Sequence, residues 1–100
     1  MKTIELKTIE GVHDGKPLKI VYKAQLIEVM KTPLNGEWAS VNEIRSSIRV
    51  MEALETATGD TLNLEDADYD HMRQCVLSMR WPIKNKLVIQ FTDDVTKQGE

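Results

Sequence analysis

The sequence predicts one α+β domain in which an N-terminal β-hairpin packs on a core of three or four helices. Before about residue 23, apolar and polar side chains alternate as they do in half-buried strands. Beyond that point, apolar residues recur at spacings of three and four, as in amphipathic helices. One hundred residues, 41% of them hydrophobic, suit one modest core. We therefore expect a single domain over 1–100, with the hairpin in 1–23 and a mainly helical part in 24–96.

Residues 3–8 and 18–22 are the two predicted strands of the hairpin, because both stretches alternate. The segment between them contains Asp14-Gly15, a dipeptide favoured in tight turns. A two-stranded hairpin is only marginally stable by itself, so we expect this one to lie against the helices.

Residues 23–31 fit two descriptions. Leu26, Ile27 and Met30 share one helical face, whereas an alternating strand is also compatible with the segment. Good helix formers dominate it, so we favour a short helix that ends before Pro33.

Residues 40–59 carry the strongest local signal, an amphipathic helix. Ser40 followed by Glu43 predicts a capping box at its start, and Gly59 supplies a left-handed residue at its end. We expect Trp38 to close over the first turn. The predicted core-facing stripe consists of Val41, Ile44, Ile48, Met51 and Leu54.

A short extended connector over 60–64 leads into a second long helix, from about 65 to 80. Acidic residues crowd its first turn, where the helix dipole favours negative charge, and Trp81-Pro82 ends it. Its predicted apolar stripe consists of Tyr69, Met72, Val76 and Met79, with Cys75 alongside.

The last element, residues 85–96, is the second ambiguous one. Its apolar residues have helical spacing, but its β-branched content also suits a strand. We favour a helix capped by Asn85.

Charge and composition restrict the partners. Residues 1–50 hold 8 Lys/Arg against 6 Asp/Glu, while residues 51–100 hold 5 against 10. The acidic second half disfavours nucleic acid as a partner. The chain has no long apolar run, no leader-like start and a single Cys75, so we expect a cytoplasmic protein without membrane association.

Two motifs suggest metal or thiol chemistry. Asp66-x-Asp68-x-Asp70 resembles the opening of a calcium loop, but His71 and Leu77 replace the glycine and the glutamate which that loop requires. His71 and Cys75 share a helix face, as a thiol or zinc site would require, but we favour a small buried cysteine beside a half-exposed histidine, because further zinc ligands are lacking. We therefore expect no catalytic residue, cofactor or metal site.

Charged side chains provide the candidate partner contacts. Arg45 and Arg49 lie four residues apart on the polar side of the central helix, and Glu52 is placed to pair with Arg49. The acids at the start of the second helix form an oppositely charged face. The predicted contacts are Arg45, Arg49, Glu65, Asp66, Asp68 and Asp70.

Several segments resemble a group of small uncharacterised proteins encoded in tailed-phage and prophage genomes. These segments, which span about residues 23–95, are Gly36 through Ser40-x-x-Glu43-x-Arg45, Ile48-Arg-Val-Met-Glu-Ala-Leu54, Leu62-x-Leu64-Glu-Asp-Ala-Asp-Tyr69 and Met79-Arg-Trp81. The resemblance carries no catalytic motif. It implies an accessory role in phage biology, such as virion assembly, through protein contacts in the host cytoplasm.

We therefore predict a non-enzymatic protein-interaction module whose partner is another protein, such as a phage structural or assembly protein, or a second copy of itself. The alternative is a small DNA-binding regulator that uses the helix over 40–58, preceded by a short helix and a loop. That loop is longer than the turn of a helix-turn-helix motif, and the candidate recognition helix over 40–58 carries few basic residues.

Overall fold

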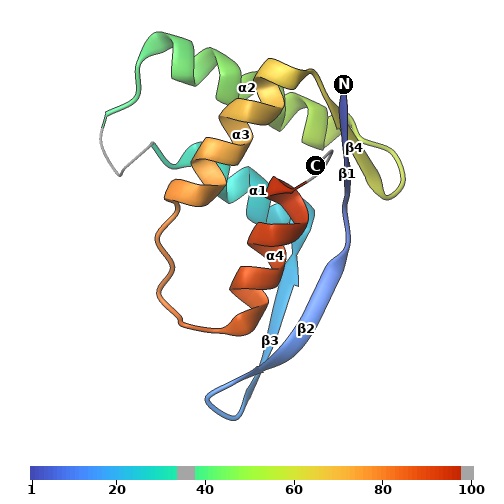
Figure 1. The fold of residues 1–100 in the computed structure, drawn as a ribbon, viewed down its shortest axis with the longest axis vertical. Coiled ribbons are helices and arrows are strands. Elements are labelled where there is room, and N and C mark those ends of the chain that lie inside the picture. Colours follow the sequence, from blue (N-terminus) through green and yellow to red (C-terminus); the bar gives the residue numbers. More distant parts are fainter. Residues whose placement is uncertain (34–37, 98–100) are drawn as a thin grey trace.

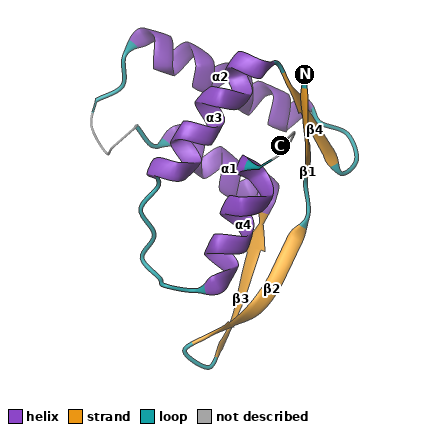
Figure 2. Cartoon of the chain, in the orientation of Figure 1, coloured by secondary structure: helices purple, strands orange, loops and turns teal. Residues whose placement is uncertain are grey.

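The computed structural model describes residues 1–33 and 38–97 and confirms the α+β class (Figure 1). The strands lie along one side of the molecule and the helices along the other (Figure 2). In chain order, the described elements are β1 (Lys2–Glu5), β2 (Thr8–His13), β3 (Lys16–Val21), α1 (Tyr22–Lys31), α2 (Val41–Thr56), β4 (Thr61–Leu64), α3 (Asp66–Ser78) and α4 (Lys86–Thr96).

The hairpin is formed by β2 and β3, joined by the predicted turn at Asp14-Gly15. Both turn residues have positive φ, 52° and 77°, the conformation that matches the twist of the flanking strands. The prediction of 3–8 as the first strand of the hairpin was wrong, because residues 2–5 form a strand that pairs elsewhere. A two-residue turn places His13 directly opposite Lys16, so the strand that pairs with β3 must occupy the residues just before the turn.

Residues 2–5 form β1, which pairs antiparallel with β4, a distant segment of the chain. Ile4 lies opposite Leu62, and both side chains are buried. The predicted extended connector is therefore a strand, and its apolar residues face the core as expected. Because of this pairing, the mainly helical part of the chain also contributes to a sheet.

Side-chain caps mark the starts of α2 and α4 where the sequence predicts them, whereas α1 and α3 begin without a side-chain cap. The segments over 23–31 and 85–96, for which a strand was the alternative, are both helical. The Asn85 side chain accepts a hydrogen bond of 3.0 Å from the Leu87 amide, and Ser40 accepts one of 3.2 Å from the Glu43 amide. Gly59 has the predicted left-handed conformation, φ 75°, but lies beyond the end of α2, in the turn into β4.

The core lies where α3 packs against all three other helices. Phe91 of α4 is fully buried and meets Tyr22 and Trp81 in edge-to-face contacts, with ring centroids 5.0 and 5.9 Å apart. The hairpin packs on α4 at Gly11, where a Cβ atom would lie 2.8 Å from Leu87 Cδ1, so this close approach favours glycine. As predicted, the hairpin rests on the helices.

The predicted inward stripe of α2 was right at its C-terminal end and wrong at its start. Leu54 is fully buried and half-buried Met51 packs against the core, as predicted. Val41, Ile44 and Ile48 are instead 63%, 45% and 43% exposed, and Val50, which was not in the predicted stripe, is fully buried. At 3.6 residues per turn, the buried face is rotated by roughly a third of a turn from the predicted one. The reason is that α3, α1 and β4 approach α2 from the side of Val50 and Leu54. The prediction for Trp38 also fails, since its side chain is 100% exposed.

Candidate functional site

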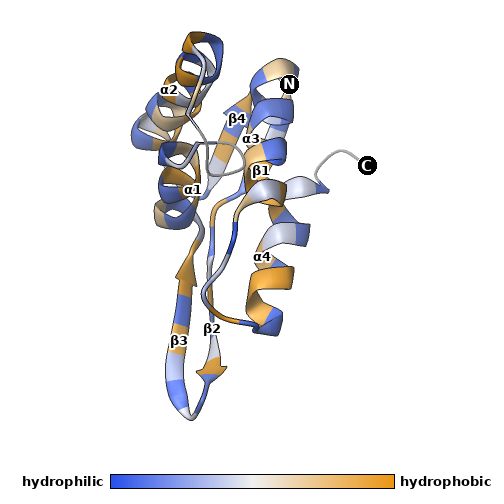
Figure 3. Cartoon of the chain, turned by 90° about the vertical axis from the view of Figure 1, so that its left-hand side faces the viewer, coloured by the Kyte–Doolittle hydropathy of each residue, from blue (hydrophilic) through white to orange (hydrophobic). Residues whose placement is uncertain are grey.

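The exposed apolar residues of α2 form the most regular uncovered surface among the described residues. We call Val41, Ile44 and Ile48 the α2 stripe. Figure 3 shows hydrophobic residues recurring along this helix, on the side of the molecule that α1 and α2 share. Fully exposed Trp38 lies just before the helix begins. Contiguous exposed apolar side chains of this kind mark binding surfaces more often than isolated ones do.

A pocket of about 290 Å³ adjoins the α2 stripe, between α2, the C-terminal end of α1 and the middle of α3. Apolar side chains supply most of its wall. We call Ser47, His71 and Cys75, which line the pocket where α2 meets α3, its floor. Its lining residues are Met30, Lys31, Thr32, Pro33, Ala39, Glu43, Ile44, Ser47, Ile48, Met51, His71 and Cys75.

His71 and Cys75 meet at this floor, as their spacing on one helix face predicted. Cys75 Sγ lies 3.6 Å from His71 Nε2, and Ser47 Oγ shares a hydrogen bond of 2.9 Å with the same nitrogen. Ser47 was not predicted, because it belongs to α2 and reaches α3 only through the way the two helices cross. No pattern in the sequence specifies that crossing.

The pKa shifts at the floor keep both groups neutral. Burial raises the pKa of the Cys75 thiol to about 11, with a smaller contribution from Glu43. Burial also lowers the pKa of His71, against the opposing effect of the Glu43 and Asp68 carboxylates. A nucleophilic cysteine instead requires a thiolate, commonly stabilised by a protonated histidine. Among the described residues, no group of three or more His, Cys, Asp or Glu side chains could hold a metal ion.

The structure brings two of the predicted contact residues together. Arg49 Nε donates to Asp68 Oδ1 at 3.0 Å, and Arg49 Nη2 donates to Ser46 Oγ at 3.1 Å. The predicted pairing of Arg49 with Glu52 is therefore wrong, because the start of α3 lies closer to the guanidinium. The basic and acidic faces predicted from the sequence meet at this ion pair.

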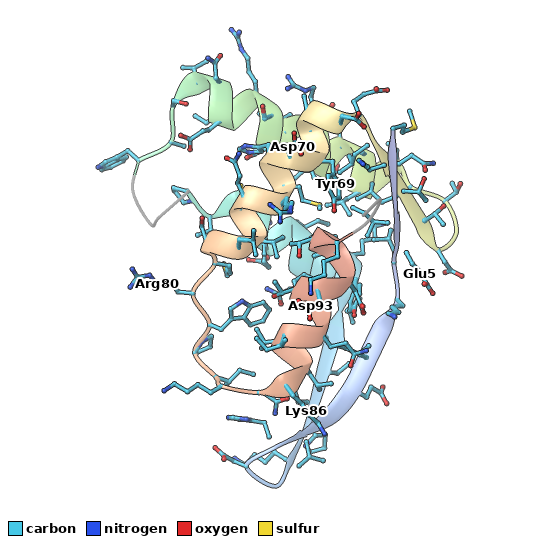
Figure 4. All side chains as sticks on the ribbon, in the orientation of Figure 1. Glu5, Tyr69, Asp70, Arg80, Lys86 and Asp93 are labelled. Atoms are coloured by element: carbon cyan, nitrogen blue, oxygen red, sulfur yellow. The ribbon has the colours of Figure 1, made fainter. Side chains whose placement is uncertain are left out.

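Of the four remaining predicted contact residues, one forms an ion pair and three form none within the described residues. The N-terminal amine lies 3.2 Å from Asp66 Oδ1. Within the described part of the chain, Arg45, Glu65 and Asp70 are exposed and make no side-chain hydrogen bond or ion pair. Figure 4 shows Asp70 on α3, the helix that the Asp66-x-Asp68-x-Asp70 segment begins. This segment is helical, as expected, and does not form a calcium-type loop.

A second hollow, of about 420 Å³, lies at the start of α4. Its exposed apolar residue Ile89 is 61% exposed, more than the two stripe residues that line the first pocket. Ile89 therefore provides a matched position for testing whether exposure alone explains an effect. The lining residues are Trp81, Ile83, Lys84, Asn85, Lys86, Val88 and Ile89.

Comparison of the chain with protein-family models, curated proteins and solved structures finds no match in any of the three. The resemblance to phage-encoded proteins therefore stays a prediction. Over residues 1–33 and 38–97, no helix combines the length and the apolar character needed to cross a membrane.

Proposed function

We propose that the protein is a non-enzymatic interaction module that binds an apolar segment of a protein along the α2 stripe and its adjoining pocket. The observation that carries this proposal is the exposure of Ile44 and Ile48 on a regular, capped helix. Grooves between helices commonly receive the apolar face of an amphipathic segment. The pocket provides such a groove, with apolar walls and few polar groups to satisfy.

The protonation states at the pocket floor support a binding role over catalysis. A neutral thiol beside a neutral imidazole is a weak nucleophile, and neither group has a carboxylate bonded to it within the described residues. The same pair can line an apolar pocket at little cost.

An accessory role in phage biology and a cytoplasmic location belong to the same proposal. Cys75 is a free cysteine, which fits a reducing compartment. The DNA-binding alternative has weaker support, because Asp68 neutralises the charge of Arg49. Arg45 is then the one basic residue of α2 that has no ion-pair partner among the described residues.

Affinity capture with three versions of the protein tests the proposal. The wild-type chain and the Ile89→Glu variant should retain the same partner from the cells that express the protein. The Ile48→Glu variant should lose it, because a buried carboxylate would face an apolar partner. Thermal unfolding of each variant checks that the fold is kept.

Capture that is unchanged by Ile48→Glu, or lost equally with Ile89→Glu, would contradict the proposal. Retention of duplex DNA that weakens steeply with salt and disappears in Arg45→Ala would favour the regulator instead.

A further inference from the structure

Two residues of opposite charge flank the α2 stripe, and their order along the helix is complementary to the same order read in the opposite direction. Arg45 precedes Ile48 by three residues, and Glu52 follows it by four. Both charged side chains are exposed, and neither forms an ion pair with another described residue. Because helical positions three and four apart are neighbours, both charges lie along the edge of the stripe that faces away from the pocket.

In a second copy of the helix that runs in the opposite direction and is centred on Ile48, Glu52 lies at the level of Arg45 and Arg45 at the level of Glu52. In an antiparallel pair related by a twofold axis beside Ile48, Ile48 meets its own copy. Such an axis keeps each edge of the helix on its own side, so Arg45 of one copy meets Glu52 of the other, and the reverse contact follows by symmetry. On the pocket edge, Ile44 meets Met51 of the second copy in the same way.

We propose that α2 binds α2 of a second copy of this chain in this antiparallel arrangement. The inference rests on the proposed function and names its partner. The α2 stripe supplies the apolar centre of the contact, two identical Arg45–Glu52 pairs close one edge, and the pocket borders the other. Each copy contributes the same surface, so the contact closes on itself and stops at a dimer.

The expected dimer is weak. α2 has 16 residues and is therefore about 24 Å long. A stable interface buries about 800 Å² on each partner, and one helix of this length covers less. Dimerisation should thus depend on protein concentration, and the edge charges should make it depend on salt.

Sedimentation equilibrium of the full chain tests the proposal through charge reversal. The wild type should dimerise reversibly. Either Arg45→Glu or Glu52→Arg should weaken the dimer by on the order of tenfold, because like charges then face each other twice. The double variant should recover the wild-type affinity, since its charges again alternate. Glu65→Arg, which changes an exposed acid outside α2, at the residue that precedes α3, should have no comparable effect.

A cross-link locates the axis independently. In a Cys75→Ala background, Ile48→Cys should give a disulfide-linked dimer on mild oxidation, whereas Ile89→Cys should not. A monomer at every concentration, or a double variant as weak as the single ones, overturns the proposal. If such a monomer still captures a different protein through Ile48, the self-pairing is wrong while the proposed function stands.

Discussion

α2 and α3 each carry an apolar stripe at helical spacing, yet only the stripe of α3 is covered. Tyr69, Met72 and Val76 are at most 3% exposed, whereas Ile44 and Ile48 are more than 40% exposed. The two helices differ in their neighbours. α3 packs against α1, α2 and α4, whereas α2 packs against α1, α3 and β4, which cover Val50 and Leu54 but leave Ile44 and Ile48 exposed. Periodicity thus shows that a helix has an apolar face, while the surrounding elements decide whether the chain itself covers it.

The largest expected effect is the difference in unfolding free energy between a substitution in the stripe of α3 and one in the α2 stripe. Met72→Ala should lower the free energy of unfolding by about 2–5 kcal/mol, because it leaves a cavity at a fully buried position. Ile48→Ala should change it by less than about 1 kcal/mol at low protein concentration, since little buried surface is lost. Urea denaturation measures both values. Equal losses would show that the α2 stripe is part of the folding core.

Much of the fold follows from local signals, and these predictions proved accurate. Asn85 caps α4, Ser40 caps α2 and Asp14-Gly15 turns the hairpin, each through interactions among a few consecutive residues. The pairing of β1 with β4 has no local signal, because the two strands are far apart in the sequence. It was therefore missed.

The orientation of α2 could not be deduced either. Val50, Ala53 and Ala57, together with Leu54 of the predicted stripe, form a second apolar series at helical spacing, so the apolar arc of the segment is wider than a single stripe. That width was a signal that part of the arc would stay exposed. The floor of the pocket depends on where α2 crosses α3, which is a tertiary property. Of the residues at the floor, helical spacing could predict only the contact between His71 and Cys75.

The second effect concerns Cys75, which lies on the buried side of α3 but at the floor of the pocket. With a pKa of about 11, only about one thiol in a thousand is ionised at pH 8. The folded protein should therefore react with a disulfide reagent on the order of a hundredfold more slowly than the urea-unfolded chain, whose thiol has an ordinary pKa. Equal rates would mean that the pocket holds an activated thiol, contrary to a binding role.

The third effect is smaller and concerns the ion pair that joins the two helices. Asp68 is 15% exposed and Arg49 is 54% exposed, so solvent screens the contact in part. A double-mutant cycle with Arg49→Ala and Asp68→Ala should give a coupling energy of about 0.2–1 kcal/mol, reduced at high salt.

The more exposed pair of Lys97 and Asp93 provides the control and should couple less strongly. A coupling well above this range would mean that the ion pair, rather than core packing, fixes the angle between α2 and α3.

The smallest expected effect is a dependence of stability on pH that is caused by the protonation of His71, the hydrogen-bond partner of Ser47. Burial holds the pKa of folded His71 below its usual 6.5, so just below that pH the unfolded chain binds more protons than the folded one. Stability should therefore fall as the pH decreases through about 6.5. Glu43 and Asp68 reduce this loss, whereas Arg49 increases it.

Urea midpoints measured from about pH 7.5 to 5.5 should show this slope in the wild type and a flatter one in His71→Gln, which keeps a polar group near Ser47. Steeper acid unfolding at lower pH should persist in both proteins, because carboxylates cause it. An unchanged slope in the variant would mean that His71 is as well hydrated as a surface residue. The junction of α2 and α3 would then be open to water, and α2 would be less firmly held than the burial of Val50 and Leu54 indicates.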